Sequence, residues 1–346
     1  MTSNRQWRLK RHPEPDEVIA TEHFSFAETP IADIGEGEFL LKTLVLGTSP
    51  AQRSYISKGL SMHDKIAVGD VMRGRGTGVV VQSRHPDYAE GDIVVASTGW
   101  QDYSVQSPGH QNPNVLSLQK VIDPVRPLTT TLGVLGSAGA TAYFGLLDVG
   151  KLRPGDTVVV SAAAGGIGSC AGQIARIAGC RVIGIAGGPA KCAWIKEAAG
   201  YHAAIDYKNE DVGDRLSELC PNGVDVFFDN VGGEILDTVL MHLALNARIV
   251  ICGFIATDYK EGGYSGPRNY VNLVRKRARM EGFFIFDYRT RFAEADARLR
   301  AWFDAGKLVN TVDIDNGLEH MPETLGSLFR GTNCGIKLCQ VAPDPD

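Results

Sequence analysis

The sequence has few cysteines, and their placement argues against both a disulfide framework and a structural zinc site. The chain of 346 residues has seven cysteines, none before Cys170, and no two of them form a C-x-x-C pair. Disulfide frameworks and zinc ribbons use even numbers of cysteines at regular, paired spacings. We therefore expect most of these cysteines to be buried thiols that pack as small apolar side chains.

Strong charge and long apolar runs are also missing. A formal net charge of -5 and a pI near 5.9 give no general electrostatic attraction to nucleic acid or to a membrane surface. Residues 1–20 are polar and charged, unlike a secretory signal, and the longest mainly apolar stretch, Leu132 to Leu147, is short for a membrane span. The size of the chain and its hydrophobic content of 44% suit two globular domains, and we expect a cytoplasmic protein.

The most informative segment is an apolar run that ends in a glycine-rich turn. Residues 156–168 read D-T-V-V-V-S-A-A-A-G-G-I-G, and a helical pattern follows. The valines suit a buried parallel strand, Gly165 permits a tight turn, and Gly168 lets the next helix pack closely on the strand. The amino end of that helix would face a pyrophosphate with unpaired N–H groups. The pattern predicts a dinucleotide site, with an ordinary strand-turn-helix as the alternative.

The end of the next strand indicates which dinucleotide binds. Arg181 to Ala186 form a second apolar strand, and an NAD site would carry an Asp or Glu near its end to bond the ribose hydroxyls. This chain has Gly187 and Gly188 there, followed by Lys191. Small residues and a cation would admit a 2′-phosphate that an acid would repel, so we favour NADP over NAD. A solvated lysine in a turn is the alternative interpretation of Lys191.

Strand and helix patterns divide the chain into two predicted domains. Residues 1–128 together with 310–346 form a β-rich substrate or catalytic domain, with short strands expected at Phe39–Leu46, Thr77–Gln82 and Ile93–Ala96. Residues 129–309 alternate apolar strands with helical segments, which is typical of an α/β domain with a doubly wound parallel sheet. Its further strands are expected at Ala204–Tyr207, Val224–Asp229, Arg248–Gly253 and Gly282–Phe286.

These features together resemble the medium-chain dehydrogenase/reductase superfamily. The shared features are the β-rich first domain, the central glycine loop, D-N-V-G-G at Asp229–Gly233 and I-C-G at Ile251–Gly253. Within the superfamily, the chain is similar to the zinc-independent leukotriene B4 12-hydroxydehydrogenase / prostaglandin reductase group and to bacterial NADP-dependent curcumin reductases. Further matches are V-M-R-G at Val71–Gly74, G-W-Q-D-Y at Gly99–Tyr103, T-A-Y-F-G-L-L at Thr141–Leu147 and R-M-E-G-F at Arg279–Phe283.

The resemblance implies fold, cofactor and chemistry together. It implies an NADP-binding Rossmann domain beside a β-rich GroES-like catalytic domain, and a homodimer. Members reduce the activated carbon-carbon double bond of small hydrophobic enals and enones: hydride adds to the β-carbon, the carbonyl oxygen takes up enolate charge, and a proton adds at the α-carbon. The protein then has to supply position and a donor for the enolate oxygen. An NADPH quinone oxidoreductase and a low-turnover NADPH-binding redox sensor remain alternatives.

The same resemblance addresses zinc. Zinc-dependent relatives carry an early Cys ligand and a G-H-E motif in the first domain. In this chain no Cys precedes Cys170, and the corresponding place reads Gly74-Arg75-Gly76. We therefore expect a protein without a bound metal.

Residue roles follow from similarity, position by position. The resemblance assigns the pyrophosphate to Gly165, Gly166, Ile167 and Gly168, the 2′-phosphate to Lys191 and Tyr207, and the ribose or nicotinamide region to Asn230, with Gly188 as a further cofactor-binding residue. The nicotinamide side would be lined by Cys252, Gly253, Phe254, Phe283, Phe284, Ile285 and Asn333. Both asparagines could instead serve as turn residues, and Tyr207 as a packed aromatic at a strand end.

The substrate side departs from the family pattern. The group commonly has D-P-Y-M-R, with a Tyr near the substrate, where this chain has Ser49 to Arg53 without an aromatic residue. Tyr55 lies close enough in the sequence to replace it. We therefore name Arg53, Tyr55, Trp100 and Tyr103 as the candidate catalytic residues on the substrate side. Packing between domains is the alternative for Trp100 and Tyr103, and water could serve as the proton source.

Overall fold

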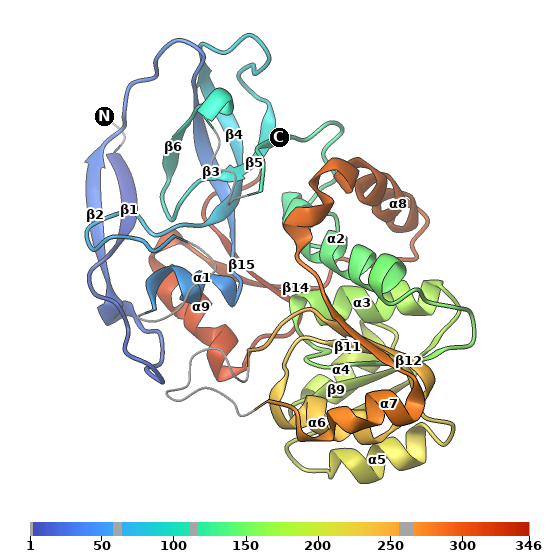
Figure 1. Cartoon of the computed structure of the whole chain (residues 1–346). Helices are drawn as coiled ribbons and strands as arrows, with labels where there is room; N and C mark the ends of the chain where they lie inside the picture. The colour runs from blue at the N-terminus through green and yellow to red at the C-terminus, as the bar shows by residue number, and fades with distance from the viewer. Residues whose placement is uncertain (1–2, 58–63, 111–115, 256–265, 346) are drawn as a thin grey trace. The chain divides into compact units, whose positions relative to one another are not determined.

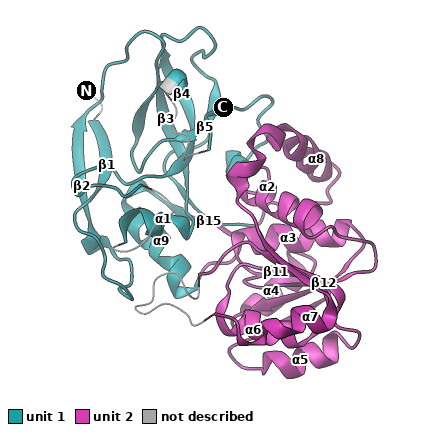
Figure 2. Ribbon diagram, viewed as in Figure 1, with its two compact units in different colours: residues 1–132, 312–332, 337–346 teal, residues 133–311, 333–336 magenta. Residues whose placement is uncertain are grey.

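The computed structural model, shown in Figure 1, describes residues 3–57, 64–110, 116–255 and 266–345. It divides into two compact units, which Figure 2 colours separately. Unit 1 comprises Met1–Leu132, Val312–Thr332 and Lys337–Asp346, and unit 2 comprises Gly133–Thr311 and Asn333–Ile336. The short segment Asn333–Ile336 therefore lies in unit 2, although the sequence analysis assigned 310–346 to the β-rich domain as a whole.

Unit 1 is built mainly from antiparallel strands. Two of them, β1 (Ser3–Leu9) and β2 (Phe24–Pro30), pair with each other. A larger sheet has the order β14-β15-β3-β4-β5-β7, with β6 also paired to β3. Its strands are β3 (Phe39–Gly47), β4 (Arg75–Ser83), β5 (Ile93–Ser97), β6 (Tyr103–Gln106), β7 (Gln119–Lys120), β14 (Val312–Asn316) and β15 (Ile336–Gln340), and the unit adds the helices α1 (Ala51–Ile56) and α9 (Met321–Arg330). The predicted strands of this unit are confirmed.

Unit 2 contains a parallel sheet with helices between its strands. The strands are β8 (Thr157–Val160), β9 (Arg181–Ala186), β10 (Ala203–Asp206), β11 (Val224–Asp229), β12 (Leu243–Ile251) and β13 (Arg279–Gly282). The helices include α2 (Ser137–Phe144), a π-helix (Gly145–Val149), α3 (Gly166–Ile177), α4 (Pro189–Glu197), α5 (Val212–Leu219), α6 (Gly233–Met241), α7 (Asn272–Lys276) and α8 (Phe292–Asp304).

The strand order β10-β9-β8-β11-β12-β13 places the first strand, β8, beside the fourth, β11. This is the order 3-2-1-4-5-6 of the Rossmann fold, in which ligands bind at the carboxyl ends of the two strands where the order reverses. Figure 1 shows α2, α3 and α8 on one side of the sheet, and α5 and α6 on the other. The predicted doubly wound sheet is therefore confirmed, and its reversal point lies between β8 and β11.

The core of unit 2 explains why its strands are so apolar. Val159, Ile183 and Phe227 lie on neighbouring strands, are fully buried, and pack with residues of α5 and α6 such as Leu216 and Val239. Strands covered on both faces by helices have no solvent-facing positions, so they appear in the sequence as continuous apolar runs.

The last strand was predicted wrongly. The expected strand at Gly282–Phe286 lies instead at β13, Arg279–Gly282, and a 3-10 helix follows at Ile285–Arg291. The apolar segment that suggested a buried strand packs elsewhere: the Phe283 ring contacts Gly145, and the Phe284 and Phe286 rings lie 4.7 Å apart. The actual strand is an edge strand with mostly exposed residues, so its sequence lacks the apolar pattern of an inner strand.

Within the residues that the structure describes, there is no helix with the length and apolar character needed to cross a membrane.

Small residues on α3 hold a tyrosine against the helix. The Tyr201 hydroxyl donates to the Gly168 carbonyl oxygen at 2.6 Å, and a Cβ placed on Gly172 would lie 2.1 Å from the Tyr201 ring. Gly172→Ala should therefore force this ring to move and lower the free energy of unfolding by about 1–3 kcal/mol. Urea unfolding measures the change. Gly109→Ala is the matched control, since Gly109 has open space around it; equal stability of the two variants would contradict the packing argument.

Candidate active site

The glycine loop that joins β8 to α3 leaves no room for a side chain at Gly168. A Cβ on Gly168 would lie 2.3 Å from the Ala162 carbonyl oxygen, and Ala162 itself has a positive φ of 46°. The Gly165 amide donates to the same Ala162 oxygen at 2.8 Å, which closes the turn. The loop and the first turn of α3 therefore approach each other at backbone distance, as the sequence predicted.

The amino end of α3 is an anion cradle made of backbone. Gly165 is its N-cap residue, no side chain caps the helix, and the first turn contains no acidic residue. The first N–H groups of a helix have no acceptor within the helix, and the helix dipole places partial positive charge there. Because glycine adds no side chain at Gly166 or Gly168, a pyrophosphate can reach the amides of the first turn of α3, so the loop fits a dinucleotide.

A buried carboxylate lies at the reversal point of the sheet. Asp229 ends β11 and is fully buried, and its carboxylate accepts hydrogen bonds from the Ser161 hydroxyl at 2.7 Å and from the Val231 and Gly232 amides. Burial raises the pKa of this carboxyl, and the three donors act in the opposite direction. The carboxyl ends of β8 and β11 are thus joined through one side chain.

The same network holds Asn230 in place. Its backbone amide donates to the Ser161 hydroxyl oxygen at 2.8 Å, and its side-chain amide donates to the Ser161 carbonyl oxygen at 2.7 Å. On the other side, the Cys252 and Gly253 amides donate to the Asp229 carbonyl oxygen, and a Cβ on Gly253 would lie 2.9 Å from the Asn230 carbonyl oxygen. Asn230 and Gly253, both predicted cofactor residues, therefore lie side by side at the ends of adjacent strands.

Sequence reasoning did not assign a role to Ser161 or Asp229. A signal was available, because each residue directly follows or ends an apolar strand, and parallel strands end at one edge of their sheet. The side-chain pairing itself required the strand order, since Ser161 and Asp229 are far apart in the chain.

Two further predicted residues lie near the loop or beside Asp229. Asn333 is buried, its side chain donates to the Gly335 carbonyl oxygen, and the Gly335 amide donates to the Ala164 carbonyl oxygen at 2.7 Å. This pairing explains why Asn333–Ile336 belongs to unit 2. Cys252 follows β12, and burial raises the pKa of its thiol to about 12, so it is a neutral thiol rather than a nucleophile.

At the end of β9 the structure reveals an acid that sequence reasoning missed. Asp206, the last residue of β10, accepts hydrogen bonds from the Gly188 amide at 2.7 Å, the Lys208 amide at 3.1 Å and the Asn209 side chain at 2.7 Å. Burial alone would raise the pKa of Asp206, but these donors outweigh it and lower the pKa below its usual value. The Asp206 carboxylate is therefore held against the Gly187-Gly188 turn. Within that turn Gly188 has a φ of 94°, a conformation that favours glycine.

The remaining predicted cofactor residues lie beside the Gly187-Gly188 turn or after the strands of unit 2. Lys191 lies in the first turn of α4, directly after the Gly187-Gly188 turn, and Tyr207 is half exposed after β10, with its amide donating to the Ala186 carbonyl oxygen. Phe254 and Phe284 are also exposed, and Ile285 begins a 3-10 helix.

In unit 1, the segment that departs from the family pattern forms α1. The Gln52 side chain accepts from the Ser49 amide at 3.0 Å and donates to the Arg73 carbonyl oxygen, which fixes the start of this helix. Arg53 is buried, with its guanidinium 5.4 Å from the Phe329 ring centre. Tyr55 is partly exposed, and burial raises the pKa of its phenol while the nearby Arg73 opposes that shift.

The two aromatic candidates of unit 1 differ in burial. Trp100 is fully buried in the core, 5.1 Å from Phe24 by ring centres, and a Cβ on Gly74 would lie 2.6 Å from its ring. This position favours packing over substrate contact. Tyr103 begins β6, is partly exposed, and exchanges two hydrogen bonds of 2.9 Å with the Asn4 side chain through its backbone.

Two other features of the described residues are separate from these predicted positions. In unit 1, His23 lies near Glu17 and Glu22, but the Arg11 guanidinium donates to both carboxylates at 2.6 and 2.7 Å, so the group forms an ion-pair network.

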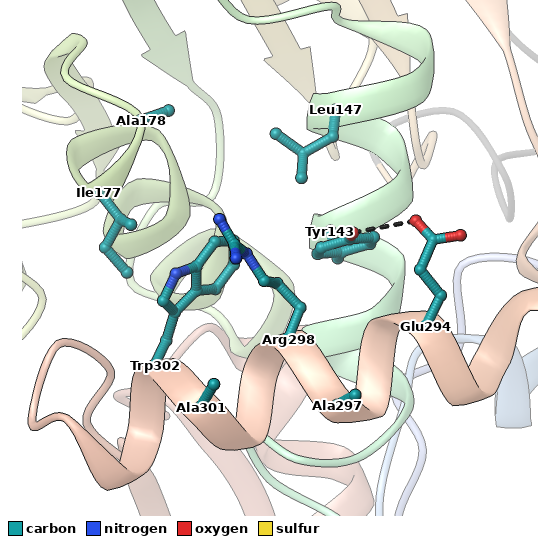
Figure 3. A pocket seen from close by; sticks show the side chains of 9 residues that line it. All are labelled: Tyr143, Leu147, Ile177, Ala178, Glu294, Ala297, Arg298, Ala301 and Trp302. Atoms are coloured by element: carbon teal, nitrogen blue, oxygen red, sulfur yellow. Dashed lines mark hydrogen bonds between the residues drawn. The ribbon is translucent and has the colours of Figure 1, made fainter.

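In unit 2, a cavity of about 730 Å³ lies between α8, the end of α3, and α2 with its π-helix. Figure 3 shows Trp302 and Arg298 pointing into this cavity. The Tyr143 hydroxyl donates a hydrogen bond to the Glu294 carboxylate. The cavity lining includes none of the predicted cofactor residues.

Comparisons with known proteins bear on the whole chain. A family model described as the N-terminal domain of oxidoreductase matches residues 5–114, and one described as zinc-binding dehydrogenase matches residues 166–301. The chain is 38% identical to the NADPH-dependent curcumin reductase of Escherichia coli, with 99% of this chain and 98% of that protein covered. It is 36% identical to an NADP(+)-dependent 2-alkenal reductase of Nicotiana tabacum, with 89% and 88% covered.

A solved structure supports the same relationship. CurA from Vibrio vulnificus, crystallised in complex with NADPH, has 36% sequence identity and a TM-score of 0.89, with 98% of this chain and 100% of that chain covered.

The buried network leads to a test of Ser161. Ser161→Ala removes one donor from a buried carboxylate, which should lower the free energy of unfolding by about 1–3 kcal/mol at neutral pH. Because the folded-state pKa of Asp229 is already raised, losing a donor raises it further, and the loss of stability should shrink as the pH falls and the carboxyl becomes protonated. Urea unfolding at neutral and acid pH measures both effects. Ser217→Ala, an exposed serine on α5, is the control; a loss independent of pH would refute the role of Asp229.

Proposed function

Because the chain belongs to the medium-chain dehydrogenase/reductase family, in the group that contains curcumin, alkenal and prostaglandin reductases, we propose that it reduces the carbon-carbon double bond of α,β-unsaturated aldehydes and ketones with NADPH. The observation that carries this proposal is the likeness to an NADPH-dependent curcumin reductase over 99% of the chain. The backbone cradle at α3 and the joined strand ends of β8 and β11 give that cofactor a place of the right chemistry.

The residues of unit 2 bind and orient the cofactor. Bound NADPH would supply the hydride that adds to the β-carbon of the substrate. The α3 amides hold the pyrophosphate, and Lys191 and Tyr207 hold the 2′-phosphate at the other end of the cofactor. Asn230 is fixed by Ser161 and orients the ribose or nicotinamide. The rigid network at Asp229 keeps this contact from shifting between the bound and free states.

We further propose that unit 1 provides the donor for the enolate oxygen through Tyr55, without zinc. A tyrosine phenol is protonated at neutral pH, as a hydrogen-bond donor must be, and burial of Tyr55 raises its pKa further. In the place of the G-H-E motif this chain has Gly74-Arg75-Gly76, which offers no His or Glu to a metal. Gly74 packs against Trp100, and the Arg75 side chain donates to the Leu116 and Ser117 carbonyl oxygens.

The proposed function is tested by following the absorbance of NADPH with a panel of enals, enones and quinones, and without an acceptor. We expect oxidation with enals and enones, slower oxidation with NADH, and no loss of activity after dialysis against a chelator. Tyr55→Phe should lower kcat and change KM little, because the phenol acts on charge that develops during the reaction. Oxidation with quinones alone would replace the proposal with a quinone oxidoreductase, and tight NADPH binding without oxidation would support a sensor.

We also propose that the chain forms a homodimer through β13. This strand ends the parallel sheet, and Met280 on it is exposed, as are Tyr270 and Val274 in the segment that precedes it in the chain. If two copies pair antiparallel about Met280, Arg279 of one strand faces Glu281 of the other, twice in the same interface. Such a self-complementary arrangement is what a twofold axis requires, and opposite charges facing each other across strands stabilise the pair.

The dimer has its own charge-reversal test. Wild-type protein should sediment at twice the chain mass of 37.3 kDa. Glu281→Arg places like charges opposite each other and should weaken the dimer, whereas the double change Arg279→Glu with Glu281→Arg restores opposite charges and should restore it. Analytical ultracentrifugation over a dilution series measures both. A double variant as weak as the single one would refute this pairing.

A further inference from the structure

A side chain at Gly187 would meet the Tyr207 ring and the stem of Lys208. A Cβ built on Gly187 would lie 2.9 Å from the Tyr207 ring at Cε1 and 3.0 Å from Cε of Lys208. Contacts this short require the neighbouring atoms to move. The face of the turn beside Gly187 is therefore filled by one aromatic ring and by the stem of one lysine.

This filled position has a specific meaning in a Rossmann fold. Gly187 directly follows β9, the second strand in the order 3-2-1-4-5-6. At about this point, NAD-binding proteins carry an Asp or Glu that bonds the ribose hydroxyls. Here, the volume that such an acid would need holds Tyr207 and Lys208 instead.

Backbone hydrogen bonds fix Tyr207 and Lys208 against the turn. The Tyr207 amide donates to the Ala186 carbonyl oxygen at 3.1 Å, and the Lys208 amide donates to the Asp206 carboxylate at 3.1 Å. Asp206 also accepts from the Gly188 amide at 2.7 Å. One carboxylate therefore holds both the glycine turn and the start of the Tyr207-Lys208 segment, so their mutual position is set by β9 and β10.

The charges at this turn suit a phosphate. Lys208 is exposed, and its ammonium lies one bond beyond the Cε that approaches Gly187. Of the two neighbouring acids, Asp206 is buried and already accepts three hydrogen bonds from the surrounding chain. Glu210 accepts from the Asp206 amide at 2.7 Å and pairs with Arg215 at 3.1 Å. A phosphate arriving beside Gly187 would thus meet an accessible cation and a neutral ring, with the Asp206 carboxylate turned inward.

We propose that Lys208 binds the 2′-phosphate of NADPH as a second cation beside Lys191, and that the Lys208 stem and the Tyr207 ring occupy the place of the ribose-binding acid. NADPH preference then has two physical causes: attraction of the phosphate, and lack of space for the acid that would favour NADH. This proposal rests on the proposed function, because it specifies how the same site selects its cofactor.

The direct test measures binding of 2′,5′-ADP and 5′-AMP to the full chain by calorimetry, without any substrate. Lys208→Gln should weaken 2′,5′-ADP roughly 10- to 100-fold and leave 5′-AMP unchanged, since only the former carries the 2′-phosphate. Lys196→Gln, an exposed lysine on α4, makes the same charge change and should leave both affinities unchanged. Unchanged affinity for 2′,5′-ADP in Lys208→Gln would overturn the role of this lysine.

A second set of variants tests the space argument. Gly187→Asp alone should weaken the binding of both NADPH and NADH, because the new side chain would meet the Tyr207 ring and the Lys208 stem. In a Tyr207→Ser, Lys208→Ser background, the same change should raise affinity for NADH above that of the background. Gly187→Asp raising NADH affinity in the otherwise unchanged chain would overturn the argument.

These readouts separate the two levels of the proposal. If wild-type protein bound 2′,5′-ADP no better than 5′-AMP, the NADP assignment would fail and this proposal with it. If that preference holds while no enone is reduced, the proposed reaction fails, and the role of Lys208 is still decided by the calorimetry.

Discussion

The fully buried Asp229 carboxylate connects the parts of unit 2 on which the candidate site depends. It accepts from Ser161 at the end of β8 and from the turn that follows β11, and its backbone carbonyl accepts from the residues after β12. A buried charge without partners is strongly unfavourable, so every one of these donors is held in place. The positions of the glycine loop, Asn230 and Gly253 relative to each other follow from this one group.

Close backbone approach is the second constraint, and it acts at both ends of the cofactor site. Gly168 lets α3 approach Ala162, so that a bound pyrophosphate would meet backbone amides. Gly187 lets Tyr207 and Lys208 lie against the end of β9. In both cases the missing side chain leaves room for the protein's own atoms: the backbone of Ala162 and Ala163 at Gly168, and the Tyr207 ring and Lys208 stem at Gly187. The first glycine brings two backbone segments together, and the second brings two side chains against a turn.

Much of this arrangement was predictable, and the errors have a common cause. Buried parallel strands appear as continuous apolar runs, so β8, β9 and β11 were found close to their observed bounds. The edge strand β13 has exposed polar residues and was displaced onto the aromatic segment after it. The sequence does not decide the role of Trp100 either, because an aromatic residue in a motif can line a pocket or pack in a core. Its complete burial favours the core.

The sequence by itself determined the fold class, the glycine loop and the preference for NADP, because these depend on local patterns: the period of apolar residues, a turn that needs glycine, and a missing acid. Only the tertiary structure decided that Ser161 serves Asp229 and Asn230, that Asp206 anchors the Gly187-Gly188 turn, and that Lys208 lies against it. Those contacts join residues from different strands. Strand order and register bring them together, and neither can be read from the local pattern of a single segment.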